Sequence, residues 1–341
     1  MPRKEKAVLV TGGAGYIGSH TVRQLVEHHR DCGVVVLDTL ERGHAESILD
    51  PEVKLFTGDM ADQEVVEEVF TTFQIEAVIH FAAYTYVGES VTEPLKYYRN
   101  NTAAPLTILE AMQRHGCKQF IFSSTAATYG NPVATPITEE HPQQPINPYG
   151  ASKLMLEQII RDCESAWGLR AVFLRYFNAS GCAPDAAIGE DHDPETHLIP
   201  LILMAISGER ENITVFGENY ETPDGTCVRD YIHVLDLANA HLKALDYLDK
   251  GGATVACNLG TGKGVSVREM LAIAEAVTGT KVPVVYGERR PGDPAELVAD
   301  PARAKAILGW EAEYTDVTEI VATAWKWMTG PAKGRYTNVK R

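Results

Sequence analysis

The chain reads Thr-Gly-Gly-Ala-Gly-Tyr-Ile-Gly over residues 11–18. This stretch follows a short apolar run, residues 6–11, and precedes a helical pattern over residues 19–29. Glycines at 12, 15 and 18 permit a tight turn and let the backbone approach a pyrophosphate, and the free N–H groups of the following helix attract that anion. The position of the glycines between a strand and a helix predicts a dinucleotide-binding unit that uses Gly12, Gly15 and Gly18.

An acidic residue stands 20 positions after the last of these glycines. Asp38 ends the second apolar run, where a carboxylate accepts hydrogen bonds from both ribose hydroxyls of adenosine and repels a 2′-phosphate. We therefore expect NAD rather than NADP, with Arg42 as the opposing signal. Asp59 follows the third run and has two interpretations of equal weight, a contact near the adenine and the N-cap of the next helix.

Apolar runs and helical patterns alternate along the first half of the chain, which favours βαβ units and a parallel sheet. We predict an α/β fold with a doubly wound parallel (Rossmann) sheet and a smaller mixed α/β C-terminal lobe. The expected domains are residues 1–178 for NAD and 179–341 for the substrate, with a segment near 228–260 returning to the first. The expected strands are 6–11, 34–37, 53–57, 77–81, 119–123 and 171–176; the expected helices are 19–29, 63–72, 91–115, 149–166, 198–207, 234–248, 267–278 and 316–328.

The composition is that of an ordinary globular chain, with 341 residues, 45% hydrophobic residues and 23% charged residues. These values exclude a disordered chain, a collagen-like repeat and a coiled coil. The net charge of −15 argues against general binding of nucleic acids. Six scattered cysteines without a C-x-x-C pair, and the absence of a long apolar stretch, lead us to expect a cytoplasmic protein with reduced thiols and no membrane partner.

Tyr149 and Lys153 lie four residues apart in a predicted helix and therefore share one face. A phenol needs its pKa lowered by roughly 3 units to act as a base at neutral pH, and an adjacent ammonium and an oxidised nicotinamide can both contribute. A hydroxyl from Ser123, Ser124 or Thr125, at the end of a predicted strand, is expected to bind the substrate alcohol and pass its proton to Tyr149.

Several motifs in fixed order resemble the extended, nucleotide-sugar branch of the short-chain dehydrogenase/reductase superfamily, and within it the UDP-glucose 4-epimerase family. The resemblance runs from residue 7 to about residue 310. The motifs that carry it are TGGAGYIGSH (11–20), GD (58–59), HFAA (80–83), VGES (87–90), FSSTAATYG (122–130), PYGASK (148–153), RYFN (175–178), VRDYIHV (228–234), NLGTG (258–262) and RRPGD (289–293).

The resemblance implies functional residues at the matching positions. The implied catalytic set is Tyr149, Lys153 and Thr125, with Ser124 beside it. The implied NAD contacts are Gly12, Gly15, Tyr16, Ile17, Gly18, Asp38, Asp59, Met60, Phe81, Ala82, Asn100, Ser123, Tyr149, Lys153 and Phe177. The implied UDP-sugar contacts are Thr125, Tyr149, Asn178, His197, Leu198, Phe216, Arg229, Arg290, Asp293 and Leu297.

The implied activity is the NAD-dependent 4-epimerisation of UDP-glucose and UDP-galactose through a 4-keto sugar, an isomerase reaction of galactose metabolism. Tyr149 takes the 4-hydroxyl proton, NAD holds the C4 hydride, and the ketone turns before the hydride returns. Related families with dehydratase or decarboxylase activity carry acidic residues where this chain has Ala126 and Ala127. The alternatives are a 4-epimerase for UDP-N-acetylhexosamine, UDP-xylose or UDP-glucuronate, and a non-catalytic NAD-binding sensor.

Two positions depart from the family pattern. Thr85 stands where some members have a lysine that reaches the cofactor, which weakens one contact. Leu297 occupies the position that limits the size of the 2-substituent of the sugar, where Tyr restricts and Cys or Ser admits an N-acetyl group. Leu297 predicts partial use of N-acetylated sugars, and a simple packing role for it is equally compatible with the sequence.

Residues 190–197 read Glu-Asp-His-Asp-Pro-Glu-Thr-His and contain potential metal ligands. We favour a polar loop there and expect no metal, since the implied reaction needs none. The family further implies a homodimer in which helices 91–115 and 149–166 of two chains pack as a four-helix bundle.

Overall fold

Seven parallel strands form the central sheet of the protein in the computed structural model, which describes residues 5–28, 32–290 and 293–336. Their order across the sheet is β10-β6-β5-β4-β1-β2-β3, so the predicted α/β doubly wound fold is confirmed. The chain leaves β1 in one direction and returns to its other side with β4, which makes the carboxyl ends of these two strands a switch point. The strands are β1 (Lys6–Thr11), β2 (Gly33–Asp38), β3 (Lys54–Thr57), β4 (Gln74–His80), β5 (Gln119–Thr125), β6 (Arg170–Tyr176) and β10 (Val255–Leu259).

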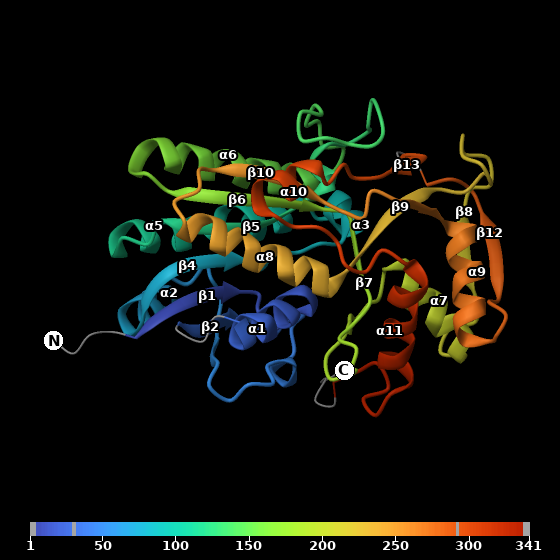
Figure 1. Cartoon of the computed structure of the whole chain (residues 1–341), viewed down its shortest axis with the longest axis horizontal. Helices are drawn as coiled ribbons and strands as arrows, with labels where there is room; N and C mark the ends of the chain where they lie inside the picture. Colours follow the sequence, from blue (N-terminus) through green and yellow to red (C-terminus); the bar gives the residue numbers. More distant parts are fainter. Residues whose placement is uncertain (1–4, 29–31, 291–292, 337–341) are drawn as a thin grey trace.

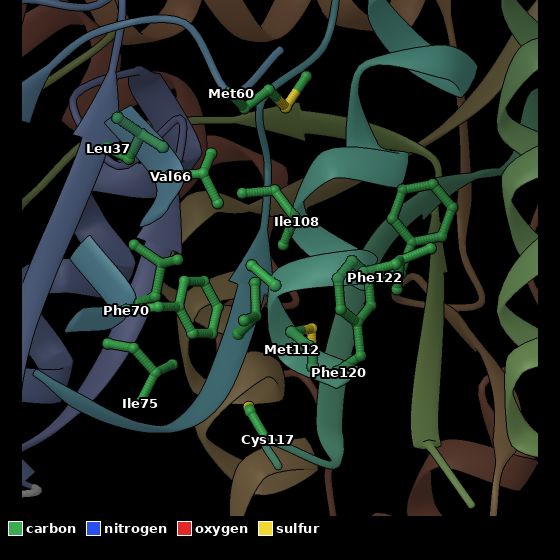
Figure 2. Close-up of a cluster of buried hydrophobic side chains, with 14 of the residues drawn as sticks. Leu37, Met60, Val66, Phe70, Ile75, Ile108, Met112, Cys117, Phe120 and Phe122 are labelled. Carbon is green, nitrogen blue, oxygen red and sulfur yellow. The ribbon is translucent and has the colours of Figure 1, made fainter. Parts of the chain in front are cut away.

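One face of the sheet is covered by α2 (Gln63–Thr72), α5 (Pro105–His115) and α6 (Pro148–Trp167). Figure 2 shows Val66 and Phe70 of α2 directed toward Ile108 and Met112 of α5 and toward Phe120 of β5. These side chains are almost fully buried. Burial of one such side chain contributes about 1.5–3 kcal/mol. Leu156 and Ile160 of α6 belong to the same core, which fixes this helix against the sheet.

The opposite face is covered by α1 (Tyr16–His28), α8 (Val234–Asp249) and α10 (Ala302–Leu308). Leu25 of α1 and Leu237 of α8 are completely buried there, and Trp310 donates its indole N–H to the carbonyl of Asp236 over 3.0 Å. Helices thus cover both faces, as a sheet of continuous apolar strands requires. The predicted helix end at His29 lies outside the described residues.

A smaller lobe lies at the end of the molecule farthest from the N-terminus (Figure 1). It has its own apolar core, in which α7, α9 and α11 surround side chains such as Ile202 and Ile320. Strand β7 pairs with β9 and connects this lobe to the end of β6. The elements are β7 (Asn178–Ser180), α7 (Leu198–Ser207), β8 (Ile213–Phe216), β9 (Val228–His233), β11 (Gly264–Ser266), α9 (Val267–Thr278), β12 (Val284–Gly287), β13 (Glu296–Leu297) and α11 (Val317–Thr329).

The long helix predicted over residues 91–115 is wrong. The chain forms α3 (Val87–Thr92), α4 (Pro94–Tyr98), a π-helical turn (Arg99–Ala103) and α5 instead. Pro94 and Pro105 each occupy the first turn of a new helix, because proline lacks the N–H that a helix interior needs. Two 3₁₀ turns, at Ala45–Ser47 and Ala126–Thr128, complete the helical elements.

Across the described ranges, none of the helices has the length and apolar character needed to cross a lipid bilayer.

Candidate active site

The glycine turn lies at the switch point between β1 and β4. Gly12 has φ +71°, and a Cβ there would lie 2.5 Å from the backbone nitrogen of Ala82. A Cβ on Gly18 would lie 2.2 Å from the carbonyl oxygen of Gly12, so the protein itself requires both glycines. A Cβ on Gly15 meets only that same oxygen, at 3.3 Å. The space beside Gly15 is therefore left open by the protein and suits a bound pyrophosphate at the start of α1.

Asp38 ends β2 beside this turn. Its carboxylate accepts from the backbone N–H of Ala14 (3.0 Å) and of Leu40 (2.9 Å), and burial raises its pKa. Arg42 donates to the Tyr86 hydroxyl (3.2 Å) and to the Asp193 carbonyl, and its guanidinium stacks 4.8 Å above the Tyr86 ring. The contacts of Arg42 are thus with Tyr86 and Asp193, and the Asp38 carboxylate lies at the position where the sequence predicts the adenosine ribose.

Some of the other predicted cofactor residues have side chains that are engaged in contacts within the protein, and others have side chains that a cofactor could reach. Tyr16 donates its hydroxyl to the Gly181 carbonyl (2.5 Å), and Met60 is buried in the core. Both can reach a dinucleotide only through the backbone. Phe81 lies half-buried against the ring of His241 (centroids 4.5 Å apart), and the half-buried Asn100 donates to the Asn101 side chain over 2.9 Å. Ile17 lies in the first turn of α1, and Ala82 lies against Gly12.

The N-cap interpretation of Asp59 is wrong. Asp62 caps α2 by accepting from the backbone N–H of Glu64 and Val65. Asp59 is exposed and accepts from the Ala61 N–H over 2.8 Å in a tight turn. Its carboxylate therefore stands free of the helix, on the solvent side of the turn after β3.

Helix α6 delivers Tyr149 to the end of β5. Asn147 caps the helix by accepting from the Gly150 N–H (2.8 Å), and Pro148 occupies its first turn, so the tyrosine is fixed one residue further along. The Thr125 hydroxyl lies close to the Tyr149 phenol and lowers its pKa. Thr125 Oγ1 also accepts from the Ala127 N–H (3.1 Å), which holds its rotamer. The pairing of Tyr149 with Thr125 is the arrangement that the sequence predicts.

Lys153 lies one turn further along the same face of α6. Its ammonium donates to the Ser123 carbonyl over 2.9 Å and lies 4.9 Å from the centre of the Phe122 ring. Burial lowers the pKa of Lys153 to about 7, and the charge of Glu157 opposes that shift. The lysine is thus anchored to the end of β5 next to Tyr149.

The Tyr149 pKa is raised in the protein by itself, not lowered as the sequence suggested. Burial raises it, and the nearby Thr125 hydroxyl works in the opposite direction. Desolvation disfavours the phenolate and also the Lys153 ammonium. A further positive charge at this site is needed before the phenol can act as a base near neutral pH.

Ser124 does not join Tyr149. Its hydroxyl donates to Glu157 Oε1 over 2.6 Å, inside a buried ion pair in which Arg175 donates from Nε (3.0 Å) and Nη2 (2.5 Å). Ser123 is paired with His241 Nε2 (2.7 Å), and its hydroxyl also lies close to the Tyr176 phenol, whose pKa it lowers. Only Thr125 of the three predicted hydroxyls reaches the phenol. Sequence reasoning assigned no role to Glu157, although it lies four residues after Lys153 on the same helical face.

The predicted UDP contacts in the small lobe form two pairs. Arg229 of β9 donates to the Asp293 carboxylate, and Arg290 lies 4.1 Å over the ring of Phe216, which is 37% exposed. Asn178 begins β7 and donates to the Asp230 carbonyl over 3.0 Å. Pro291 and Gly292, between Arg290 and Asp293, lie outside the described residues.

Leu297 connects the small lobe with the catalytic end of β5. It pairs with Arg229 in the β13–β9 register and packs, with Phe177, against Ala126, Tyr129 and Ile137. Ala126 directly follows Thr125, so this leucine lies close to the predicted sugar position. Thr85, where some family members carry a lysine, is exposed.

His197 and Leu198 begin α7, at the end of the loop that sequence analysis interpreted as polar. His197 Nδ1 bonds Glu190 Oε1, and the side chains of His192 and Glu195 lie against the same pair. The imidazole of His197 is directed into this cluster. A nucleotide contact at His197 would therefore use the backbone.

Comparisons with known proteins agree with this geometry. The family model described as GDP-mannose 4,6 dehydratase matches residues 9–323. A UDP-glucose 4-epimerase from Halalkalibacterium halodurans is 50% identical over 94% of this chain and 95% of its own. The solved UDP-glucose 4-epimerase from Brucella ovis, in complex with NAD, is 48% identical, with a TM-score of 0.90 over 94% of this chain and 97% of its own. The Bifidobacterium longum enzyme with NAD+ and UDP is 40% identical, with a TM-score of 0.90 over 96% and 100%. This chain belongs to the UDP-glucose 4-epimerase family, an extended branch of the short-chain dehydrogenases.

Proposed function

We propose that the protein is an NAD-dependent epimerase that interconverts UDP-glucose and UDP-galactose at C4 of the hexose. The observation that carries this proposal is the placement of the Tyr149 phenol beside the Thr125 hydroxyl at the end of β5, with Lys153 on the Ser123 carbonyl, in a chain that is about half identical to UDP-glucose 4-epimerases. A non-catalytic NAD sensor would not need to retain this pair together with Lys153. An NAD-dependent epimerase needs all three groups.

The residues at the switch point fit NAD. The open space beside Gly15 accepts the pyrophosphate, and Asp38 at the end of β2 accepts from ribose hydroxyls. Lys153, Phe81 and Asn100 complete the set that would hold the nicotinamide half. When bound, NAD takes up the C4 hydride, returns it to the other face of the sugar, and adds a positive charge near the buried phenol.

Tyr149 and Thr125 handle the proton of the sugar 4-hydroxyl. Thr125 binds that hydroxyl and relays its proton, and Tyr149 accepts it as the phenolate. A positive charge beside the phenol would oppose the rise of the Tyr149 pKa that burial causes. Lys153 donates to the Ser123 carbonyl, which holds its ammonium beside Tyr149 while the proton returns to the sugar. This cycle regenerates the tyrosine with each turnover.

The small lobe binds the UDP half of the substrate. Arg229 and Arg290 offer planar, bidentate donors for the diphosphate, Asp293 accepts from ribose hydroxyls, and Phe216 packs on the uracil ring. The hexose contacts few side chains of the protein, and Leu297 is one of them. Strong binding of the nucleotide with weak binding of the hexose lets a 4-keto sugar turn between the two hydride transfers.

Replacement of Tyr149 by phenylalanine tests this function. The variant is expected to bind NAD and UDP but to interconvert UDP-glucose and UDP-galactose at least about 100-fold more slowly, the lower end of general acid–base contributions. NMR of the products reports the configuration at C4, and a Lys118→Ala variant in the loop before β5 serves as control. Unimpaired epimerisation by Tyr149→Phe would rule out the proposed scheme.

We also keep the expected division into an NAD domain, residues 1–178 with a returning segment near 228–260, and a UDP-sugar lobe, residues 179–341. A homodimer is supported by exposed apolar side chains on the helices that the family implies, namely Val91 (62% exposed), Leu95 (65%) and Met155 (47%). A cytoplasmic location is supported by the six cysteines, all of which are free thiols.

A further inference from the structure

Four potential metal ligands converge in the loop between β7 and α7. Glu190, His192, Glu195 and His197 each direct one ligand atom to a common point, and all four atoms lie within 4.8 Å of one another. The sequence spacing alone did not favour a metal here. The folded loop brings together two imidazoles and two carboxylates, the mixture of nitrogen and oxygen donors that zinc and its neighbours prefer.

Three nitrogen–oxygen distances in the cluster are close to the edge of a coordination tetrahedron, while His197 Nδ1 and Glu190 Oε1 lie closer together, in direct contact. His192 Nδ1 lies 3.2 Å from Glu190 Oε1 and 3.7 Å from Glu195 Oε2, and His197 Nδ1 lies 3.5 Å from Glu195 Oε1. Zinc bonds of about 2.0–2.1 Å to nitrogen and oxygen give a tetrahedral edge of about 3.3 Å. A divalent ion fits between the four atoms with small movements of the side chains.

The two carboxylates of the cluster are buried and point to a cation at its centre, while the His197 side chain at its edge is 45% exposed. The carboxylate side chains of Glu190 and Glu195 are only 6% and 8% exposed. Two buried carboxylates require two positive charges nearby. His192 Nδ1 is shielded from solvent and has no hydrogen-bond partner among the described residues, although it points at both glutamates. A metal ion supplies the partner that this nitrogen lacks, and it balances both carboxylates while the imidazoles stay neutral.

The backbone of the loop is held by groups from other elements. Trp327 of α11 donates to the Glu190 carbonyl (2.9 Å), and the Tyr336 N–H donates to the Asp191 carboxylate (2.9 Å). Tyr86 donates to the Pro194 carbonyl over 2.8 Å. These contacts preform the loop, so the four ligand side chains do not have to be brought together by the ion alone.

We propose that Glu190, His192, Glu195 and His197 bind one zinc ion or a similar divalent transition-metal ion. The site is structural, because all four positions are taken by protein atoms. It fixes the loop where it passes the ring of Tyr16, whose centroid lies 6.1 Å from that of His192, and where it enters α7. The ion thereby joins the first turn of α1, the small lobe and the C-terminal segment around Tyr336.

Zinc titration of the full-length chain, freed of any affinity tag and stripped with a chelator, tests the site. We expect one zinc per chain, measured by competition with a chromophoric chelator. His192→Ala and Glu195→Gln should each weaken binding by about 100-fold or more, since even outer-shell partners of a metal contribute 10–100-fold. The matched control is His115→Ala, which removes an exposed histidine paired with Glu67 and should leave zinc binding unchanged.

Two further measurements keep the test decisive if a variant folds poorly. The wild-type melting temperature should fall on chelation and return on addition of zinc. Cobalt(II) should give the visible spectrum of a tetrahedral nitrogen–oxygen site. Absence of stoichiometric zinc binding, wild-type affinity in both variants, or a cobalt spectrum dominated by thiolate charge transfer, which would place the ion on the cysteines, would each overturn the proposal.

Discussion

Ser124 donates its hydroxyl hydrogen to Glu157 Oε1 over 2.6 Å, on the side of β5 that α6 covers. Thr125, the next residue, places its hydroxyl beside the Tyr149 phenol at the end of the strand and lowers the pKa of that phenol. Side chains of adjacent strand residues point to opposite faces, so the two neighbouring hydroxyls belong to different environments. One supports a buried ion pair, and the other is available to a substrate.

This separation predicts different outcomes for the two substitutions. Thr125→Val should lower kcat about 100-fold or more with little change in KM, because it removes a proton relay and retains the shape of the side chain. Ser124→Ala should keep kcat within a few-fold and lower the free energy of unfolding by about 1–3 kcal/mol, because Glu157 loses a buried donor. Steady-state kinetics and urea denaturation measure both. Equal losses of kcat in the two variants would contradict the assignment.

The glycine turn gives a second matched pair. Gly15→Ala should fold with nearly unchanged stability and lose NAD, since its Cβ meets only the Gly12 oxygen, at 3.3 Å, and otherwise fills the pyrophosphate space. Gly18→Ala should destabilise the fold itself, since its Cβ would lie 2.2 Å from that oxygen. Bound NAD, quantified after denaturation, and the melting temperature separate the two effects. Full NAD content in a folded Gly15→Ala variant would show that the space does not hold the cofactor.

Leu297 is expected to set the tolerance for the 2-substituent of the sugar. The wild type should turn over UDP-N-acetylgalactosamine partially, relative to UDP-galactose. Leu297→Tyr should lower that ratio of kcat/KM and Leu297→Ser should raise it, because the side chain packs beside Ala126 next to the catalytic threonine. Competition assays with both sugars measure the ratio. An unchanged ratio of kcat/KM in both variants would contradict this prediction and would leave Leu297 with a packing role alone.

Buried neutral histidines predict a loss of stability in mild acid. Burial lowers the pKa of His20 and His241 to about 4 and of His80 and His233 to about 3, against an ordinary value of 6.5. The unfolded chain then binds more protons than the native one below pH 6.5, so the free energy of unfolding falls as pH falls. At pH 5, each of these four histidines lowers the free energy of unfolding by about 2 kcal/mol. Urea denaturation between pH 7 and pH 5 should show this loss, and His80→Asn should reduce it by about 2 kcal/mol. A flat profile would contradict the prediction.

The proposed dimer depends on apolar side chains that the single chain leaves exposed. Leu95→Glu places a charge on α4 at a side chain that is 65% exposed, so it should shift the protein from dimer to monomer without unfolding it. Val133→Glu, in the exposed loop after β5, is the control, since Val133 is 79% exposed and lies outside the predicted bundle helices. Light scattering after size-exclusion chromatography gives the mass. A monomeric wild type, or a dimeric Leu95→Glu variant, would refute the bundle.

Local signals predicted much of the fold. Gln63–Thr72, Leu198–Ser207 and Val267–Thr278 form helices with the predicted bounds. Helix α6 is bounded by the Asn147 cap and by Gly168 at φ +76°, both of which are readable from sequence. The segment 91–115 was mispredicted as one helix, because an apolar helical pattern does not reveal that a π-helical turn can absorb the change of direction between Pro94 and Pro105. The short strands of the small lobe pair with partners far along the chain, which local patterns do not encode.

The sequence predicted those site residues whose place in the backbone a motif fixes. It did not predict contacts whose partners come from elements far along the chain. Gly12, Tyr149 and Lys153 follow from spacing along the glycine turn and one helix, and the choice of Thr125 among the three hydroxyls follows from the family resemblance. The period of two along β5 could have separated Ser124 from Thr125. The partners of Ser123 and Glu157, such as His241, are brought in by long-range packing and carry no local signal. The raised Tyr149 pKa depends on burial, which spacing does not report.

Strand β10 closes the sheet beside β6, although residues 177–254 separate the two strands along the chain. During synthesis, β6 emerges long before its neighbour and leaves its row of N–H and C=O groups, and buried residues such as Val172 and Leu174, without cover on that side. Open strand edges of this kind recruit other chains. A chain truncated after residue 178 therefore exposes the unpaired edge of β6 and is expected to aggregate. The full chain carries the same risk during synthesis until β10, which ends at residue 259, has left the ribosome and paired with β6.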